Sequence, residues 1–69
     1  MNKWLLKERE FQILVLMAKN NTNKQIAEAI NISIHTVKAH NTNMFRKLNA
    51  KNRTEAVVNA IKKGYIILE

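Results

Sequence analysis

The fold is decided by residues 22–40, TNKQIAEAINISIHTVKAH, which begin two helices separated by one short turn. Thr22 and Gln25 have the spacing of a capping box, in which each side chain accepts the backbone N–H of the other residue, so a helix begins at this point. We expect this helix to end near Ile30. Ser33 then caps the next helix by accepting a backbone N–H bond. Two helices joined by so short a turn are typical of a helix-turn-helix.

The rest of the chain adds one helix on each side of this pair. Cap residues and apolar residues at helical spacing predict four helices, over about 7–19, 22–30, 33–48 and 52–63. Asn20 and Gly64 stand where the first and fourth helices stop, and both residue types tolerate a left-handed conformation. The pair Asn52 and Glu55 forms a second capping-box pattern. The chain has no proline and one glycine, so strand and hairpin signals are missing. We therefore predict an all-α fold, a four-helix bundle that contains a helix-turn-helix.

The apolar positions of each helix indicate one inward face. Outside the third helix these positions are Leu6, Ile13, Leu14, Met17, Ala18, Ile26, Ala27, Ile30, Ala56, Val57, Ala60 and Ile61. Glu10 shares the inward face of the first helix and needs a basic partner there. A chain of 69 residues supports one small domain, so we expect a single domain over 1–69 with its core at about 6–64. The apolar tail 65–68 should fold back or meet a partner.

The charge balance points to a polyanionic partner. Twelve Lys and Arg face five Asp and Glu, which gives a net charge of +7. DNA, RNA and an anionic membrane surface are the usual partners of such a basic domain. The alternative is that the positive charge only keeps the domain soluble. The sequence lacks the run of about 18 apolar residues that spans a membrane. It also lacks a signal peptide.

Cysteine usage excludes several kinds of site. The chain has no cysteine, so disulfides and thiolate metal sites are excluded and a reducing cytoplasm is permitted. His35 and His40 are the remaining soft metal ligands, without a third partner at a sensible spacing. We expect no metal, no cofactor and a cytoplasmic location. The carboxylate pairs or nucleophile–base pairs of an enzyme are absent, so we expect no catalysis.

The third helix has two faces of opposite character. Its inward face carries Val37, Asn41, Met44 and Leu48, flanked by Ile34 and Phe45. Its outward face carries His35, Ala39, Thr42, Asn43 and Arg46, with Lys38 and Lys47 at the edges. Lys and Arg suit guanine edges, Asn suits adenine, and the methyl groups of Ala and Thr suit the thymine methyl. A solvated helix face is the alternative, but residues 19–53 hold seven basic residues and one acidic residue.

Phosphate contacts are expected around this helix. Helix N-termini expose free N–H groups that bind anions. The candidates at the two N-termini and further along the chain are Thr22, Asn23, Lys24, Ser33, Thr36, Lys47, Lys51 and Arg53. Thr22, Ser33 and Asn52 act first as caps, with or without a phosphate. His40 lies at the boundary of the two faces, where a structural role and a phosphate contact are both open.

These residues together resemble a known family. The segment 6–60, about four-fifths of the chain, is similar to the LuxR-type domain, also called LuxR/FixJ or GerE. The matching pieces, in order, are Arg9-Glu10, Ile13-Leu14, residues 22–27 (TNKQIA), residues 33–38 (SIHTVK), His40, Lys47-Leu48 and residues 52–56 (NRTEA).

The resemblance implies a four-helix effector domain whose third helix enters the major groove of DNA. It implies homodimers, formed through the fourth helix, on two-fold related half-sites. By position it places Lys38, Ala39 and Thr42 at the bases, and Lys24, Thr36 and His40 near phosphates or in support of the helix. It also implies an internal ion pair of Glu10 with Arg53. The expected dimer contact is Val58, exposed beside Ile61 and Lys62.

Four positions depart from the family pattern. Lys7 replaces a Thr cap, so the first helix is expected to fray, and Asn20 replaces a frequent Gly. Asn41 replaces an aliphatic residue, so it needs a hydrogen-bond partner or lies at the core edge and reaches DNA. Thr42 is shorter than a typical basic reader, so base preference does not carry over from relatives.

Other functions were weighed against DNA binding. A protein-interaction module with this fold would carry an acidic third-helix face, whereas this face is basic. A promoter-recognition segment of a sigma factor has a related fold, and the sequence of residues 22–38 argues against it. We expect double-stranded DNA as the partner, RNA polymerase as a further candidate, and no small-molecule site. The chain is either a stand-alone regulator or the effector domain of a response regulator or ligand-sensing regulator.

Overall fold

The computed structural model describes residues 6–67, and this part of the chain contains four helices and no strand. The helices are α1 (Glu8–Ala18), α2 (Asn23–Ile30), α3 (Ile34–Lys47) and α4 (Arg53–Lys62). The all-α prediction is confirmed, and each helix begins within a residue or two of its predicted start. Met1–Leu5, Leu68 and Glu69, which the single-domain prediction includes, lie outside the described residues.

Local hydrogen bonds explain why α2, α3 and α4 begin where they do. At α2 the capping box is complete: Thr22 Oγ1 accepts from Gln25 N at 3.1 Å, and Gln25 Oε1 accepts from Thr22 N at 2.8 Å. Ser33 Oγ accepts from the N–H of Thr36 at the start of α3. At α4 one of the two predicted capping-box bonds forms: Asn52 Oδ1 accepts from Glu55 N–H. The Glu55 carboxylate accepts from the N–H of Lys51, one residue before the cap, and not from that of Asn52.

The start of α1 differs from the expectation of a frayed end. Lys7 has no side-chain oxygen with which to cap the helix, yet α1 begins at Glu8. Phe11 N donates to Lys7 O at 2.9 Å, which closes the first turn. Glu10 Oε1 accepts from Lys7 N–H at 2.9 Å, so the third helical residue satisfies the backbone donor that precedes the helix.

All four helices end in the same way. A residue with positive φ follows each helix, and these residues are Asn20, Asn31, Asn49 and Gly64, with φ of 72°, 59°, 54° and 80°. The next N–H donates back across the last turn, as Tyr65 N does to Ala60 O at 2.9 Å. This pattern is the Schellman motif, which satisfies the free carbonyl groups at a helix end.

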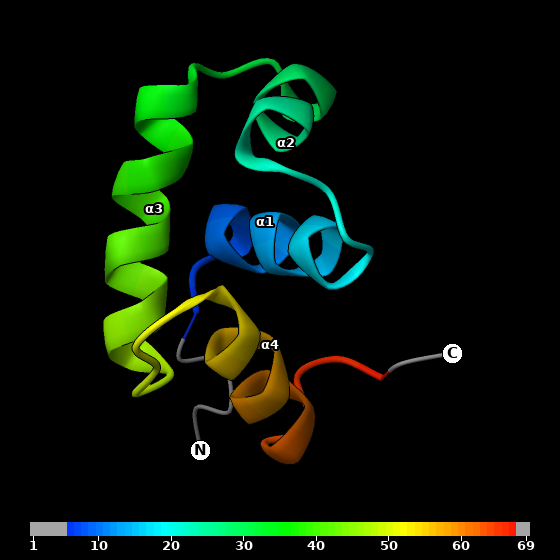
Figure 1. Cartoon of the computed structure of the whole chain (residues 1–69), viewed down its shortest axis with the longest axis vertical. Helices are drawn as coiled ribbons and strands as arrows, with labels where there is room; N and C mark the ends of the chain where they lie inside the picture. Colours follow the sequence, from blue (N-terminus) through cyan, green and yellow to red (C-terminus); the bar gives the residue numbers. More distant parts are fainter. Residues whose placement is uncertain (1–5, 68–69) are drawn as a thin grey trace.

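The helices pack around α1. Helix α1 lies at the centre and contacts the other three, and α3 also contacts all three (Figure 1). The core is formed by Leu6, Ile13, Leu14, Met17, Ile26, Ala27, Val37, Met44, Leu48, Ala56 and Ala60. Four predicted core residues, Ala18, Ile30, Val57 and Ile61, are half-buried. Ile34, the first residue of α3, is 40% exposed.

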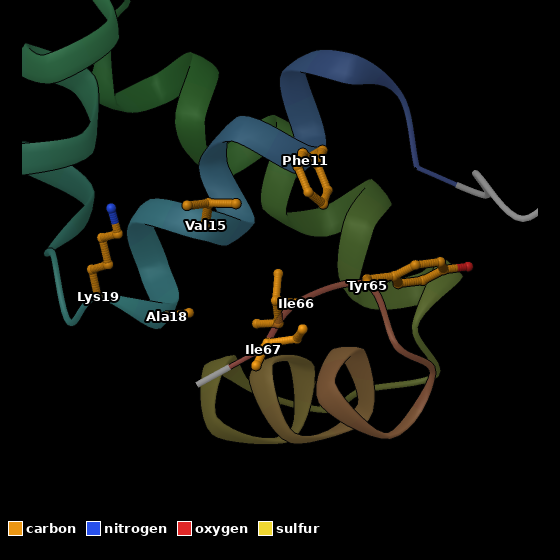
Figure 2. A pocket seen from close by; sticks show the side chains of 7 residues that line it. All are labelled: Phe11, Val15, Ala18, Lys19, Tyr65, Ile66 and Ile67. Atoms are coloured by element: carbon orange, nitrogen blue, oxygen red, sulfur yellow. The ribbon is translucent and has the colours of Figure 1, made fainter. Parts of the chain in front are cut away.

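The tail after α4 folds back along α1. Tyr65 and Ile66 are half-buried against the core, whereas Ile67 is 86% exposed. They form one wall of a groove of about 520 Å³, and the other wall is formed by Phe11, Val15 and Ala18 of α1 and by Lys19, which follows it (Figure 2). The predicted fold-back is confirmed for residues 65 and 66, and Leu68 lies outside the described residues.

Candidate nucleic-acid interface

The outward face of α3 is exposed to solvent in the described fold. The six residues predicted to read bases are all exposed: His35, Lys38, Ala39, Thr42, Asn43 and Arg46. The other three helices lie to one side of α3 and leave its far side open along its length (Figure 1). Helix α3 contains no acidic residue. This side of the helix therefore presents Lys38 and Arg46 to solvent without a carboxylate on the same helix.

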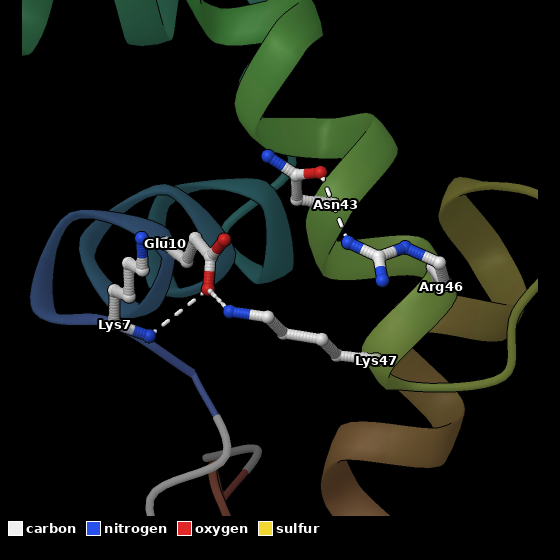
Figure 3. A network of polar contacts seen from close by, with 5 residues as sticks. All are labelled: Lys7, Glu10, Asn43, Arg46 and Lys47. Carbon is white, nitrogen blue, oxygen red and sulfur yellow. Dashed lines mark hydrogen bonds and ion pairs between the residues drawn. The ribbon is translucent and has the colours of Figure 1, made fainter.

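Two hydrogen bonds within α3 hold side chains on this open face. Thr42 Oγ1 donates to Lys38 O at 3.1 Å. The Arg46 guanidinium donates to Asn43 Oδ1 at 3.2 Å, one turn away (Figure 3). Both bonds join residues three or four positions apart, as helix geometry allows. They reduce the number of rotamers open to these side chains.

The residues predicted to meet phosphates lie mostly around the ends of α2 and α3. Thr22, Lys24, Ser33 and Lys51 are exposed, and Asn23, Thr36 and His40 are half-buried. Ser33 Oγ and Thr36 Oγ1 are 2.9 Å apart, so these two hydroxyl groups are bonded to one another. The first backbone N–H groups of α2 and α3 have no carbonyl partner within their own helix, and such groups attract anions.

Lys47 has a different partner from the phosphate that the sequence suggested. Its Nζ lies 2.9 Å from Oε1 of Glu10, and its side chain is 20% exposed (Figure 3). Glu10 is 2% exposed and also accepts from Lys7 N–H. Burial raises the pKa of Glu10, but the hydrogen bonds and charges of Lys47 and Lys7 outweigh it and lower the pKa below its ordinary value. The Lys47 ammonium group therefore forms an ion pair with a buried carboxylate within the fold.

The expected ion pair of Glu10 with Arg53 is wrong. The Arg53 guanidinium donates to the carbonyl of Asn21, in the connection between α1 and α2. Glu10 instead meets Lys47, because α3 crosses α1 at the level of Glu10. The sequence contains one usable signal, a carboxylate on an inward face that needs a cation, but helical spacing alone does not decide between Lys47 and Arg53 as its partner.

Asn41 lies in the core and not on the outward face of α3. It is 9% exposed, and its Nδ2 donates to Asn23 Oδ1 on α2 at 3.2 Å. Its own Oδ1 is buried and has no hydrogen-bond partner. The expectation that Asn41 might reach DNA is therefore wrong. The amide oxygen of Asn23 accepts the hydrogen bond from Asn41. The NH₂ group and the backbone N–H of Asn23 are therefore the donors that it can offer to an anion.

Sequence reasoning missed one polar contact that shapes the end of α3. The Asn59 amide on α4 donates to the carbonyls of Leu48 and Asn49, at 2.9 and 3.3 Å. These carbonyls close α3, so Asn59 fixes the position of α4 relative to it. The α4 residues proposed for a dimer contact differ in exposure: Val58 is 41% exposed, Ile61 is half-buried and Lys62 is exposed.

The described residues lack the features of a metal site and of a membrane span. Residues 6–67 contain no group of three or more His, Cys, Asp or Glu that could hold a metal ion. In the same residues, no helix has the length and apolar character needed to cross a membrane.

Comparison with known proteins identifies the family. The model for the luxR family of bacterial regulatory proteins, also named GerE, matches residues 5–60. The chain belongs to the luxR family. A solved structure of the transcription factor GerE superposes on 94% of the chain with a TM-score of 0.87 and 31% sequence identity, and the match covers 97% of that chain. The luxR-type fold predicted from the sequence is thereby confirmed.

Two curated proteins of Staphylococcus are similar to most of this chain. The oxygen regulatory protein NreC of Staphylococcus carnosus is 48% identical over 59 residues, which are 86% of this chain and 27% of NreC. The response regulator protein VraR of Staphylococcus aureus is 45% identical over 62 residues, which are 90% of this chain and 30% of VraR. The chain thus spans less than a third of the length of these relatives. It is a LuxR-type DNA-binding domain of transcription regulators, a class that is not an enzyme family.

Proposed function

We propose that this domain binds double-stranded DNA sequence-specifically, with α3 in the major groove. The observation that carries the proposal is the open face of α3, with six exposed side chains, two of them cationic, and no acidic residue on the helix. A major groove admits one α-helix, and its base edges offer acceptors to such cations. The shared fold with the transcription factor GerE supports a role in transcription.

Phosphate contacts supply most of the affinity in this proposal. We assign them to the exposed residues Thr22, Lys24, Ser33 and Lys51, and to the free N–H groups at the starts of α2 and α3. Asn23, Thr36 and His40 are half-buried. We assign them a supporting role, in which their N–H and O–H groups that are not bonded within the fold donate to the same phosphates. Lys47 is not assigned to this set, because it pairs with Glu10.

We further propose that two copies bind together on two-fold related half-sites. Val58 is a large apolar side chain, 41% exposed, on α4, and Ile61 and Lys62 lie beside it. Helix α4 packs on α1 and α3 and leaves this side free within the described fold. A symmetric contact of α4 with its copy would set two α3 helices about one turn of DNA apart.

The printed names of the two relatives, an oxygen regulatory protein and a response regulator protein, support a cellular role for this domain. We propose that residues 1–69 form one folded unit with its core at about 6–64, that it acts in the cytoplasm without catalysis or a cofactor, and that it serves as the DNA-binding part of a regulator of transcription. RNA polymerase is a candidate partner of such a regulator.

A salt series tests the proposed function. Gel shifts of random duplex DNA should show binding that weakens by about 0.9 power of salt concentration per neutralised phosphate. Selection from a random duplex library should then yield a motif with two-fold symmetry. The proposal would be overturned if the protein did not shift duplex DNA in the gel at low salt, or if its affinity for DNA did not change with salt concentration.

A further inference from the structure

Helices α3 and α4 meet at a junction that relates the outward face of α3 to the free side of α4. In the proposed function α3 contacts the bases and α4 contacts a second copy of the chain. Residues 48–52 connect the two helices, and α4 starts close to the end of α3 (Figure 1). So short a connection fixes the start of α4, but a single point of attachment does not fix the direction in which a helix runs.

The polar contacts at the start of α4 are local. Asn52 Oδ1 accepts from Glu55 N–H at 2.9 Å, and the Glu55 carboxylate accepts from Lys51 N–H at 2.8 Å. Further along, the buried side chains of α4 are those of Ala56 and Ala60. Each of these has one methyl group, which makes fewer packing contacts than a larger side chain. Burial of two alanines therefore restricts the tilt of α4 less than larger core residues would.

Asn59 supplies a second point of attachment between the two helices. Its Nδ2 donates to the carbonyl of Leu48 at 2.9 Å and to that of Asn49 at 3.3 Å. Asn59 lies six residues after the first residue of α4, which is about 9 Å along a helix axis. Two attachments separated by this distance fix the direction of α4 relative to the end of α3.

The surroundings of Asn59 give these two hydrogen bonds their weight. A hollow of about 240 Å³ lies at the junction, lined by Leu48, Asn49, Asn59, Lys62 and Lys63. Lys62 and Lys63 are exposed, and Leu48 is the one apolar residue among the five. On this side of the junction, the amide of Asn59 therefore joins α4 to the end of α3 where apolar side chains do not fill the space.

The neighbour of Asn59 in the sequence is the proposed dimer contact. Val58 is 41% exposed, whereas Asn59 is half-buried. Successive residues of a helix point about 100° apart, so Val58 can face a second copy while Asn59 faces α3. The direction in which Val58 is presented, relative to α3, then depends on the hydrogen bonds of Asn59.

We propose that Asn59 is a positioning residue that sets how the two α3 helices of a DNA-bound dimer are oriented, and thereby which spacing of half-sites the protein selects. This role rests on the proposed DNA binding and dimer contact. In a two-fold dimer a change in the angle between α3 and α4 occurs in both copies, so its effect is doubled. Each base pair turns the duplex by about 34°, so a spacing changed by one base pair demands a large reorientation of one α3 helix.

Duplexes with two copies of the selected half-site test this role. The wild-type protein should prefer one spacing, and a change of one or two base pairs should weaken binding about 5- to 150-fold, the effect of breaking two hydrogen bonds. For Asn59→Ala the same change should weaken binding less than about five-fold, because α4 can then tilt to follow the half-sites. Affinity for a single half-site should stay within about two-fold of wild type, because Asn59 is distant from the outward face of α3.

Two further variants accompany Asn59→Ala. Asn59→Asp has nearly the same shape but no N–H donor, so it should lose the spacing preference in the same way. Thr54→Ala is the matched control, because it removes an exposed polar side chain from the same helix, and it should keep the wild-type preference.

A measurement without DNA examines the junction directly. The chain has no cysteine, so Lys38→Cys and Lys62→Cys introduce the only two thiols for spin labels, one on α3 and one near the end of α4. The distribution of distances between the labels should be narrow with Asn59 present and broader in Asn59→Ala. Equal widths would overturn the positioning role, whatever the behaviour on DNA.

The outcomes on DNA separate this role from the proposed function. Absence of any salt-dependent binding by the wild-type protein would overturn the proposed function. Binding without a preferred spacing would overturn the positioning role together with the proposed two-fold arrangement. If the wild type prefers one spacing and Asn59→Ala keeps that preference, or loses affinity equally for every spacing and for a single half-site, the positioning role alone is wrong.

Discussion

Two polar side chains, Glu10 and Asn41, lie in the core formed by the described residues. The carboxylate of Glu10 has two donors, Lys47 Nζ and Lys7 N–H. The amide of Asn41 has one partner and one unpaired oxygen. A buried polar group that is fully paired adds stability, whereas an unpaired one costs free energy. The two residues therefore affect the stability of the fold in opposite directions.

The pH dependence of stability should report on Glu10. Its pKa is lower in the folded state than the ordinary value of 4.5, so its stabilisation is present above about pH 4.5 and is lost as the pH falls through the lowered pKa. Glu10→Gln should lower the free energy of unfolding at pH 7 by about 1–3 kcal/mol and flatten its acid dependence. Urea unfolding between pH 7 and pH 3 measures this, with exposed Glu28→Gln as the control. Parallel curves for wild type and Glu10→Gln would contradict the role of this pair.

Asn41→Val should stabilise the domain. The substitution removes a buried oxygen that has no donor, and Asn23 is half-buried and regains water as a partner. We expect a gain of about 1 kcal/mol in the free energy of unfolding. Thermal unfolding measures the gain. A loss of stability would show that the Asn41 oxygen has a partner, such as a buried water.

Lys38→Ala tests a single side chain on the open face. Lys38 is exposed in the middle of α3. Loss of a base contact should weaken binding by about 1–3 kcal/mol and relax base preference at one position. Binding-site selection with wild type and variant measures both effects. Unchanged affinity and preference would refute the assignment of this face to the groove.

At the scale of the element, each helix is defined by its own ends. A side chain or a neighbouring carboxylate satisfies donors at the start, and a Schellman motif satisfies carbonyls at the finish. Three of the four stops use Asn in the left-handed conformation. The turn between α2 and α3 depends on one of these, Asn31, which reverses the chain so that Ser33 can cap α3 two residues later.

Asn31→Ala should weaken this turn. Asn31 has φ of 59°, a conformation that costs a residue with Cβ and no local hydrogen bond about 1 kcal/mol. Such a loss lowers the melting temperature of a domain of this size by roughly 4–8 °C. Asn31→Gly is the matched control and should melt close to wild type, because Gly adopts this φ freely. Equal melting temperatures for the Ala and Gly variants would argue against strain at this position.

At the scale of the whole molecule, the packing of α1, α2 and α4 on one side of α3 leaves two free surfaces with different roles. The open face of α3 is polar and basic, and the free side of α4 carries an exposed apolar residue, Val58. The groove between α1 and residues 65–67 lies on a third side. The proposed DNA and dimer contacts therefore do not compete for the same residues.

Val58→Glu should prevent cooperative binding. A charge in the proposed α4 contact should abolish the dimer complex on a probe with two half-sites, while binding to a single half-site stays within about two-fold. Gel shifts on the two probes measure the difference. Ile67→Glu is the control, because Ile67 is an exposed apolar residue outside α4. An intact two-site complex in Val58→Glu would show that the copies meet elsewhere.

Cap residues, apolar spacing and the run of cations allowed much of this structure to be predicted. The starts of α2 and α3 and the stops at Asn20 and Gly64 follow from hydrogen bonds between residues close in sequence. The helical spacing of the apolar residues predicted which side of α3 faces outward, and the packing of the other helices on its apolar side leaves that face exposed. The family could also be recognised, because its motifs consist of these same caps and core positions. The identity of the bases and the dimer contact stay predictions.

The amino-acid sequence by itself determined where each helix begins and ends and which side of the helix is apolar, because capping and helical periodicity involve residues close in sequence. Only the tertiary structure decided that Glu10 pairs with Lys47, 37 residues away, and that Asn41 bonds Asn23 and not DNA. Several cations were equally suitable for Glu10 by sequence. The packing of α3 across α1 brings Lys47 to Glu10, because helix packing places residues that are distant in sequence within the roughly 3 Å of a hydrogen bond.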